Sequence, residues 1–185
     1  METVWRTALW RQFGAAIDAL DNALAACPDS LWTERLWPSP PPAWFPPQFG
    51  EFWHVSFHAL AWLDLYLSGV PEEEFAPPAP FVQGEIDSAE ALPDRPYTKE
   101  QLRTYLASLR RKCQATLTGL TNEQASRPVE YPWSKGQPIS FLELLIYNMR
   151  HVQEHAVQLS LFLGQHGVPD EDIGWVARAK AEPGS

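Results

Sequence analysis

Residues Glu51–Ser68 read EFWHVSFHALAWLDLYLS. The apolar residues of this stretch fall on nearly every side of a helix, which is typical of a helix that is packed on several sides. Gly69 and Pro71 follow, and both residue types favour the end of a helix. We therefore expect a helix that lies among other helices.

Three further segments have the apolar spacing of amphipathic helices: residues 2–26, about 98–120 and about 140–163. Capping-box patterns open the last two, with Thr98 paired to Gln101 and Ser140 to Glu143. We therefore predict an all-α four-helix bundle.

Two long connections interrupt the predicted helices. Residues 27–50 are rich in proline and tryptophan, and residues 69–97 are rich in proline and carry an acidic run. They join the first helix to the second and the second to the third, and we expect the latter to fold back over one end of the helices. The sequence leaves open whether one extra helical turn follows Thr121 and whether residues 129–139 form a short hairpin.

The length and composition limit the class of protein. A chain of 185 residues suits one domain, which we place at residues 1–165, followed by a partly flexible tail at 166–185. The net charge of −9 argues against a nucleic-acid partner. No apolar run reaches the ~20 residues of a membrane span, and Glu2 and Arg6 interrupt any signal peptide. Two cysteines without CxxC spacing suit reduced thiols, so we expect a cytoplasmic protein.

Four of the five histidines form two pairs with the same spacing, His54 with His58 and His151 with His155. Residues four apart share one face of a helix, so two such imidazoles can reach one metal ion. One pair alone is more often made of hydrogen-bonded core residues. Two pairs on separate helices of one bundle favour a metal site, and imidazole ligands favour zinc, nickel, copper or iron over magnesium or calcium.

Three stretches carry a resemblance to a known family: residues 57–67 (FHALAWLDLYL), 97–100 (YTKE) and 148–159 (NMRHVQEHAVQL). They resemble the DinB-like (DinB/YfiT) superfamily of metal-dependent enzymes, and the similarity covers about residues 1–165. The resemblance implies an up-down-down-up bundle in which the second helix supplies one histidine and the fourth supplies two. It therefore implies His58, His151 and His155 as ligands. His54, one turn earlier, is a candidate fourth ligand, a group that supports the ligands, or a substrate contact.

The resemblance also implies a chemistry, namely thiol-dependent transfer, isomerisation or hydrolysis. We expect the divalent ion to be zinc or nickel. Three neutral imidazoles leave such an ion its full charge and an open coordination position, so that it can activate a thiol or water. We therefore predict a metal-dependent transferase or hydrolase with a small-molecule or thiol substrate. Tyr147 and Asp64 are the catalytic candidates, since Tyr147 lies one turn before His151 and Asp64 could hydrogen-bond a ligand imidazole. Gln158 could do the same.

Other interpretations stay open. A closed four-histidine site that includes His54 would make the chain a non-catalytic metal-binding or scaffold protein. Residues 151–155 also match the H-x-x-E-H motif of inverted zinc peptidases, but a further glutamate ligand on a helix is not found downstream. A di-iron carboxylate bundle would need a second E-x-x-H motif, and Val152 stands at that position.

Large aromatic residues predict assembly. The first and fourth helices carry more of them than one bundle face needs: Trp5, Trp10, Phe13, Phe141 and Phe162. Exposed aromatic surface often marks an interface, so we predict a homodimer. In the alternative, the proline- and tryptophan-rich connection covers these residues.

Overall fold

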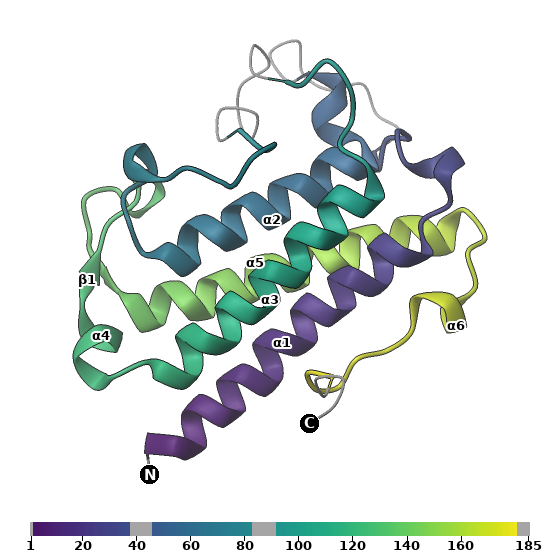
Figure 1. Ribbon diagram of the computed structural model, residues 1–185. Coiled ribbons are helices and arrows are strands. Elements are labelled where there is room, and N and C mark those ends of the chain that lie inside the picture. Colours follow the sequence, from purple (N-terminus) through teal and green to yellow (C-terminus); the bar gives the residue numbers. More distant parts are fainter. Residues whose placement is uncertain (1, 38–45, 83–91, 181–185) are drawn as a thin grey trace.

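The computed structural model describes residues 2–37, 46–82 and 92–180, and four long helices dominate it (Figure 1). These are α1 (Glu2–Ala26), α2 (Phe52–Ser68), α3 (Lys99–Gly119) and α5 (Phe141–Gln165). Both α1 and α2 pack against α3 and α5, so α1 and α2 are diagonal to each other. The predicted all-α fold is confirmed, and its helices lie close to the expected boundaries.

Short elements complete the described chain. They comprise two short helices, α4 (Asn122–Ser126) and α6 (Asp170–Ile173), four 3-10 turns at Asp29–Leu31, Pro47–Gly50, Glu72–Glu74 and Pro132–Ser134, and two strands, β1 (Pro128–Val129) and β2 (Ile139–Ser140). The strands pair antiparallel, Val129 opposite Ile139. The helical turn after Thr121 and the short hairpin, both left open by the sequence, are thus present.

The helix ends follow the local chemistry of the sequence. Thr98 and Gln101 form the reciprocal capping box at the start of α3. At α5, the Ser140 hydroxyl accepts a bond from the Glu143 amide, which is one half of the predicted box. Gly69 ends α2 with a φ of 62°, a left-handed conformation that glycine adopts without steric cost.

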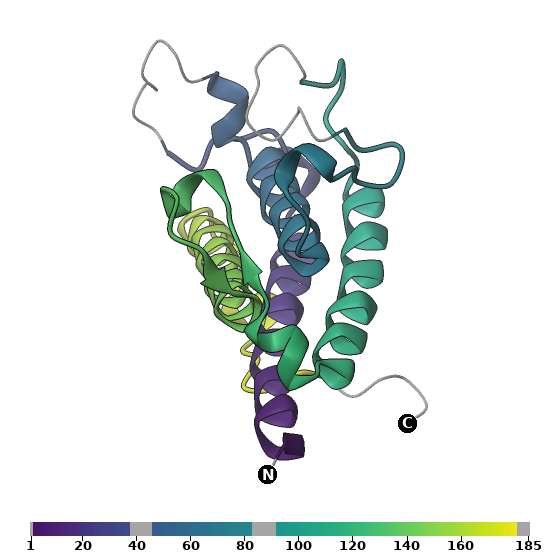
Figure 2. The same ribbon diagram turned by 90° about the vertical axis from the view of Figure 1, so that its left-hand side faces the viewer.

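Helix α2 is the most enclosed element, and all but a few of its residues are buried. The first connection ties back to it, since the Phe52 amide donates to the Glu34 carbonyl. In the second connection, Phe81 stacks on Tyr105 of α3 with ring centroids 4.6 Å apart and lies 5.7 Å from Phe57 of α2. In Figure 2 the described parts of both connections lie in the upper half of the view. The first connection leads into the N-terminal end of α2, whereas the second begins at the C-terminal end, where the Tyr131 hydroxyl donates to the Val70 carbonyl at 2.9 Å. Residues 38–45 and 83–91 of these connections lie outside the described chain.

Three of the five aromatic residues that the sequence assigns to an interface are buried, and for these three the assignment was wrong. Phe13, Phe141 and Phe162 are 0%, 6% and 3% exposed, because they point into the core between the helices. Trp5 and Trp10 are partly buried against the same core. A homodimer stays a prediction, but it needs a different surface.

The C-terminal segment returns along α1 after α6 (Figure 1). The Ala179 amide donates to the Arg11 carbonyl at 2.9 Å, and the Lys180 amide donates to the Asp18 carboxylate at 2.6 Å. The same carboxylate pairs with Arg110 of α3 at 2.7 Å. The division of the chain at residue 165 stays a prediction, and residues 181–185 lie outside the described part.

Candidate metal centre

Helices α2 and α5 bring three histidines together. The Nε2 atom of His151 lies 3.3 Å from Nε2 of His58 and 3.1 Å from Nε2 of His155. One ligand atom from each of the three side chains lies within 4.8 Å of the other two. We call these three residues the histidine triad. Four bonds of ~2.1 Å in a tetrahedron place neighbouring donors about 3.4 Å apart, so the triad needs only a small adjustment to hold one ion.

The packing of α2 against α5 is fixed near the triad by a buried side chain. Asn148, which is fully buried, donates from Nδ2 to the Leu63 carbonyl of α2 at 3.1 Å. The bond crosses the helix interface three residues before His151 on α5 and five residues after His58 on α2. It therefore fixes how far α5 slides along α2. Sequence reasoning missed this role, although an asparagine at a core position of α5 was a signal for it.

Gln158 orients one of the triad imidazoles. Its Oε1 atom lies 2.9 Å from Nδ1 of His155. In the tautomer whose Nε2 is free to bind a metal, Nδ1 of His155 carries the proton and donates it to this oxygen. The lone pair on Nε2 then faces the other two histidines, as a metal ligand requires. The sequence had suggested this contact for Gln158.

The surroundings keep the triad neutral. Burial and, after it, the charge of the neighbouring His155 lower the pKa of His151 to about 3. Burial and then the other histidines hold the pKa of His58 well below its usual 6.5. The pKa of His155 is also lowered, mainly by burial, although the bond to Gln158 opposes this. Neutral imidazole is the form that binds a metal, so these shifts favour coordination near neutral pH.

The donor set indicates the class of ion that fits. Among the residues that the structure describes, no carboxylate or thiolate joins the triad. Three imidazoles suit transition metals and suit magnesium or calcium poorly, since those ions need oxygen ligands. The triad is thus compatible with a site for a divalent transition metal.

The structure does not place His54 in the triad. This side chain is 2% exposed and stacks on Phe49 with ring centroids 4.4 Å apart. The rings of Trp53 and Phe57 meet it edge-on at 5.2 and 6.3 Å. His54 therefore lies in an aromatic environment one turn before His58. It remains near enough that its charge would lower the pKa of His58.

A family model described as the DinB superfamily matches residues 12–159. The chain belongs to the DinB superfamily. The match spans most of the four long helices and includes all three triad residues. No curated protein and no solved structure matches the chain.

Aromatic side chains surround one side of the triad in this DinB-superfamily chain. Tyr147 stacks on Trp133 at 4.6 Å between ring centroids and lies 6.4 Å from the His151 ring. Tyr66 accepts a hydrogen bond from Nε1 of Trp133 at 3.1 Å, and burial raises the pKa of its hydroxyl. Trp62 lies 6.1 Å from the ring of His58. Tyr147 thus lies beside the triad, as the sequence suggested, and its catalytic role stays a prediction.

Asp64 faces away from the triad towards α3. One carboxylate oxygen accepts from the Tyr105 hydroxyl at 2.6 Å, and the other accepts from Nζ of Lys112 at 2.5 Å. The carboxylate is 6% exposed, so these bonds compensate for its burial. Among the described residues, Asp64 has no hydrogen bond to a triad imidazole. Its contacts favour a structural link between α2 and α3 over the catalytic role expected from sequence.

None of the described helices combines the length and the hydrophobicity that a membrane span needs.

Proposed function

We propose that the histidine triad binds one divalent transition-metal ion, zinc or nickel, and that the chain is an enzyme that activates a thiol or water for group transfer or hydrolysis. The convergence of the three Nε2 atoms, with separations of 3.1 and 3.3 Å, carries this proposal. Membership of the DinB superfamily supports it. The substrate is a small molecule or a thiol.

Each part of the site has a distinct task in this proposal. A divalent ion held by three neutral imidazoles supplies an anionic nucleophile near neutral pH, because it lowers the pKa of a thiol or water. Gln158 orients the ring of His155, and Asn148 holds the position of α5 along α2. The half-buried Tyr147 and its partner Trp133 limit access of water beside His151 and offer a flat apolar contact for the substrate.

An open coordination position separates the enzyme from a closed structural site. The position of His54 among Phe49, Trp53 and Phe57 supports three protein ligands rather than four. A closed four-histidine site would need His54 to leave this stacked environment. The geometry therefore supports the catalytic proposal over the scaffold alternative.

Cobalt substitution tests the open position directly. Protein loaded with Co²⁺ is titrated with a small thiol such as 2-mercaptoethanol, and the absorption spectrum is recorded. We expect a sulfur-to-cobalt charge-transfer band that saturates at one thiol per chain. The variant His54→Ala should give the same band, whereas His151→Ala should give none. A Co²⁺ spectrum that no thiol changes would support the closed site and contradict the proposal.

We also propose that the protein acts in the cytoplasm. Cys27 and Cys113 are both buried free thiols. Burial raises the pKa of Cys27 to about 12 and also raises that of Cys113, so both stay protonated and unreactive. Two such thiols suit a reducing compartment. Localisation of a fluorescently tagged chain in its native host would test this.

A further inference from the structure

A column of aromatic rings stands beside His151. The rings of Tyr131, Trp133 and Tyr147 follow one another with centroids 6.1 and 4.6 Å apart, and successive planes are inclined by only 7° and 26°. The His151 ring continues the column, 6.4 Å from Tyr147 and inclined to it by 20°. A triad histidine is therefore one end of a stacked series that begins on the connection between β1 and β2.

Tyr66 of α2 holds the column in place. Its ring is 3% exposed and stands nearly perpendicular to the rings of Tyr131, Trp133 and His151, at angles of 89°, 87° and 80°. Its hydroxyl accepts the hydrogen bond from Nε1 of Trp133 at 3.1 Å. Rings that are held from several sides lose little freedom when a ligand binds, so they are preorganised for contact. We call four residues the aromatic platform: Tyr66, Tyr131, Trp133 and Tyr147.

Solvent reaches the platform at Trp133. This side chain is 38% exposed, although the rings of all three other platform residues contact it. Stacking of a flat conjugated ring on an aromatic side chain adds about 2-fold to 10-fold in affinity beyond the effect of the area that is buried. A cation, by contrast, needs ring faces that converge on one point, whereas the rings of the column are nearly parallel. The platform therefore suits a flat ring.

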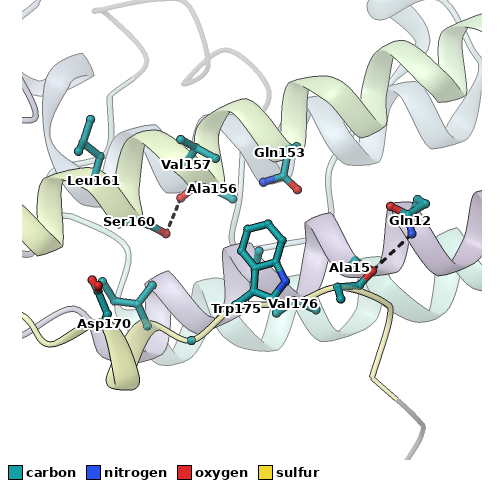
Figure 3. Close-up of a pocket in the computed structure, with 14 residues that line it drawn as sticks. Gln12, Ala15, Gln153, Ala156, Val157, Ser160, Leu161, Asp170, Trp175 and Val176 are labelled. Carbon is teal, nitrogen blue, oxygen red and sulfur yellow. Dashed lines mark hydrogen bonds between the residues drawn. The ribbon is translucent and has the colours of Figure 1, made fainter.

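The hollow between α1 and α5 differs from the platform. Its volume is about 580 Å³, and among the described residues neither a triad histidine nor a platform ring lines it. Trp175, which does line it, is 92% exposed and lies between the two helices in Figure 3. Of the two surfaces, the platform is the one in ring contact with a triad histidine. It is thus the better placed of the two for a ligand of the metal ion.

We propose that the aromatic platform selects substrates that carry a flat conjugated ring, such as aryl-substituted thiols, which stack on Trp133 and Tyr147 while the sulfur binds the ion. The inference rests on the proposed metal-dependent function and names the substrate class for that site. Trp133 determines the specificity, because its ring is the exposed one. Tyr66 is a positioning residue, since it holds Trp133 through the hydrogen bond to Nε1.

Two thiols of similar size test the selection in Co²⁺-loaded protein. 2-Phenylethanethiol and 2-cyclohexylethanethiol share the same linker and differ in the flatness of the ring, and the sulfur-to-cobalt band gives a dissociation constant for each. We expect wild type to bind the phenyl compound about 3-fold to 10-fold more tightly. The cyclohexyl ring is the more hydrophobic, so burial of apolar area alone would favour the other compound.

The outcomes separate this inference from the proposed function. Equal dissociation constants, or tighter binding of the cyclohexyl compound, would overturn the inference and leave the metal site intact. The absence of a charge-transfer band with either thiol would contradict the proposed function, and the inference would fall with it.

Variants identify the selecting residue. Trp133→Leu should reduce the preference to within about 2-fold, because stacking is lost, while binding of the cyclohexyl compound shows that the metal site is intact. Trp133→Phe keeps a ring without Nε1 and should retain most of the preference. The matched control is Trp175→Leu, which removes an exposed tryptophan from the hollow between α1 and α5 and should leave the preference unchanged. A preference that persists in Trp133→Leu would overturn the assignment.

Discussion

The two histidine pairs have the same spacing but different surroundings. On α5, both His151 and His155 reach the triad. On α2, only His58 does so, while His54 is stacked on Phe49. Side chains four apart differ by about 40° around the helix and about 6 Å along it. His58 lies beside both His151 and His155 along the length of the helices, whereas His54 lies one turn further along α2. Identical spacing therefore does not imply an identical role, and the neighbouring helix decides which ligands meet.

The largest expected effect separates the two members of the α2 pair. His58→Ala should weaken zinc binding by more than about 100-fold, because a three-imidazole site loses a ligand. His54→Ala should leave zinc affinity within a few-fold of wild type. It should lower the free energy of unfolding by about 2–3 kcal/mol, since it leaves a cavity among aromatic rings. Isothermal titration calorimetry and urea unfolding of both variants measure these effects, and equal losses of zinc affinity would indicate four ligands.

The next effect concerns pH, in protein from which metal has been removed. In the folded protein the pKa values of the triad histidines lie below 6.5, whereas in the unfolded chain they are ~6.5. At a pH between the folded-state and unfolded-state values, these residues therefore bind protons only in the unfolded chain. Their contribution to stability is complete above ~6.5 and is lost as pH falls through the lowered values. In this pH range each histidine changes the free energy of unfolding by up to about 1.4 kcal/mol per pH unit. Urea unfolding at several pH values measures the slope.

A variant provides the control for this pH effect. His151→Ala with His155→Ala removes two of the three titrating groups and should flatten the slope between pH ~6.5 and the lowered pKa values. An unchanged slope in this variant would assign the pH dependence to other residues. His54→Ala, measured in parallel, would then show whether the buried histidine outside the triad is responsible.

A smaller effect is expected from the side chain that orients His155. Gln158→Leu removes the acceptor for the Nδ1 proton and keeps most of the volume, so zinc affinity should fall by about 10-fold to 100-fold. Gln153→Leu is the matched control, since Gln153 is an exposed glutamine on the same helix. Competition with a chromophoric chelator gives both affinities. If the two variants bind zinc equally well, Gln158 does not orient the ligand.

Much of this architecture was predictable because it depends on local signals. The capping residue Thr98 and the terminating Gly69 mark helix ends through backbone chemistry that neighbouring residues determine. The spacing of His151 and His155 is likewise local. The rotation of a helix about its own axis is not a local property. Helix α2 is apolar on nearly every side, so its sequence does not show which side faces α5. The choice between His54 and His58 therefore rested on family resemblance.

Two side chains illustrate the same limit. Asp64 was expected near the ligands, yet it bonds Tyr105 and Lys112 of α3, which is a consequence of how α2 is rotated. Phe13 was expected at an interface, yet it is fully buried. In each case the residue type was informative, but its partner comes from a distant part of the sequence.

A crystal structure of zinc-loaded protein, with anomalous data collected at the zinc edge, tests the central claim most directly. We expect one strong anomalous peak per chain at about 2.1 Å from Nε2 of His58, His151 and His155. His54 should remain stacked on Phe49, and a non-protein ligand should complete the coordination. A peak that is coordinated by His54, or the absence of any peak at the triad, would contradict the account.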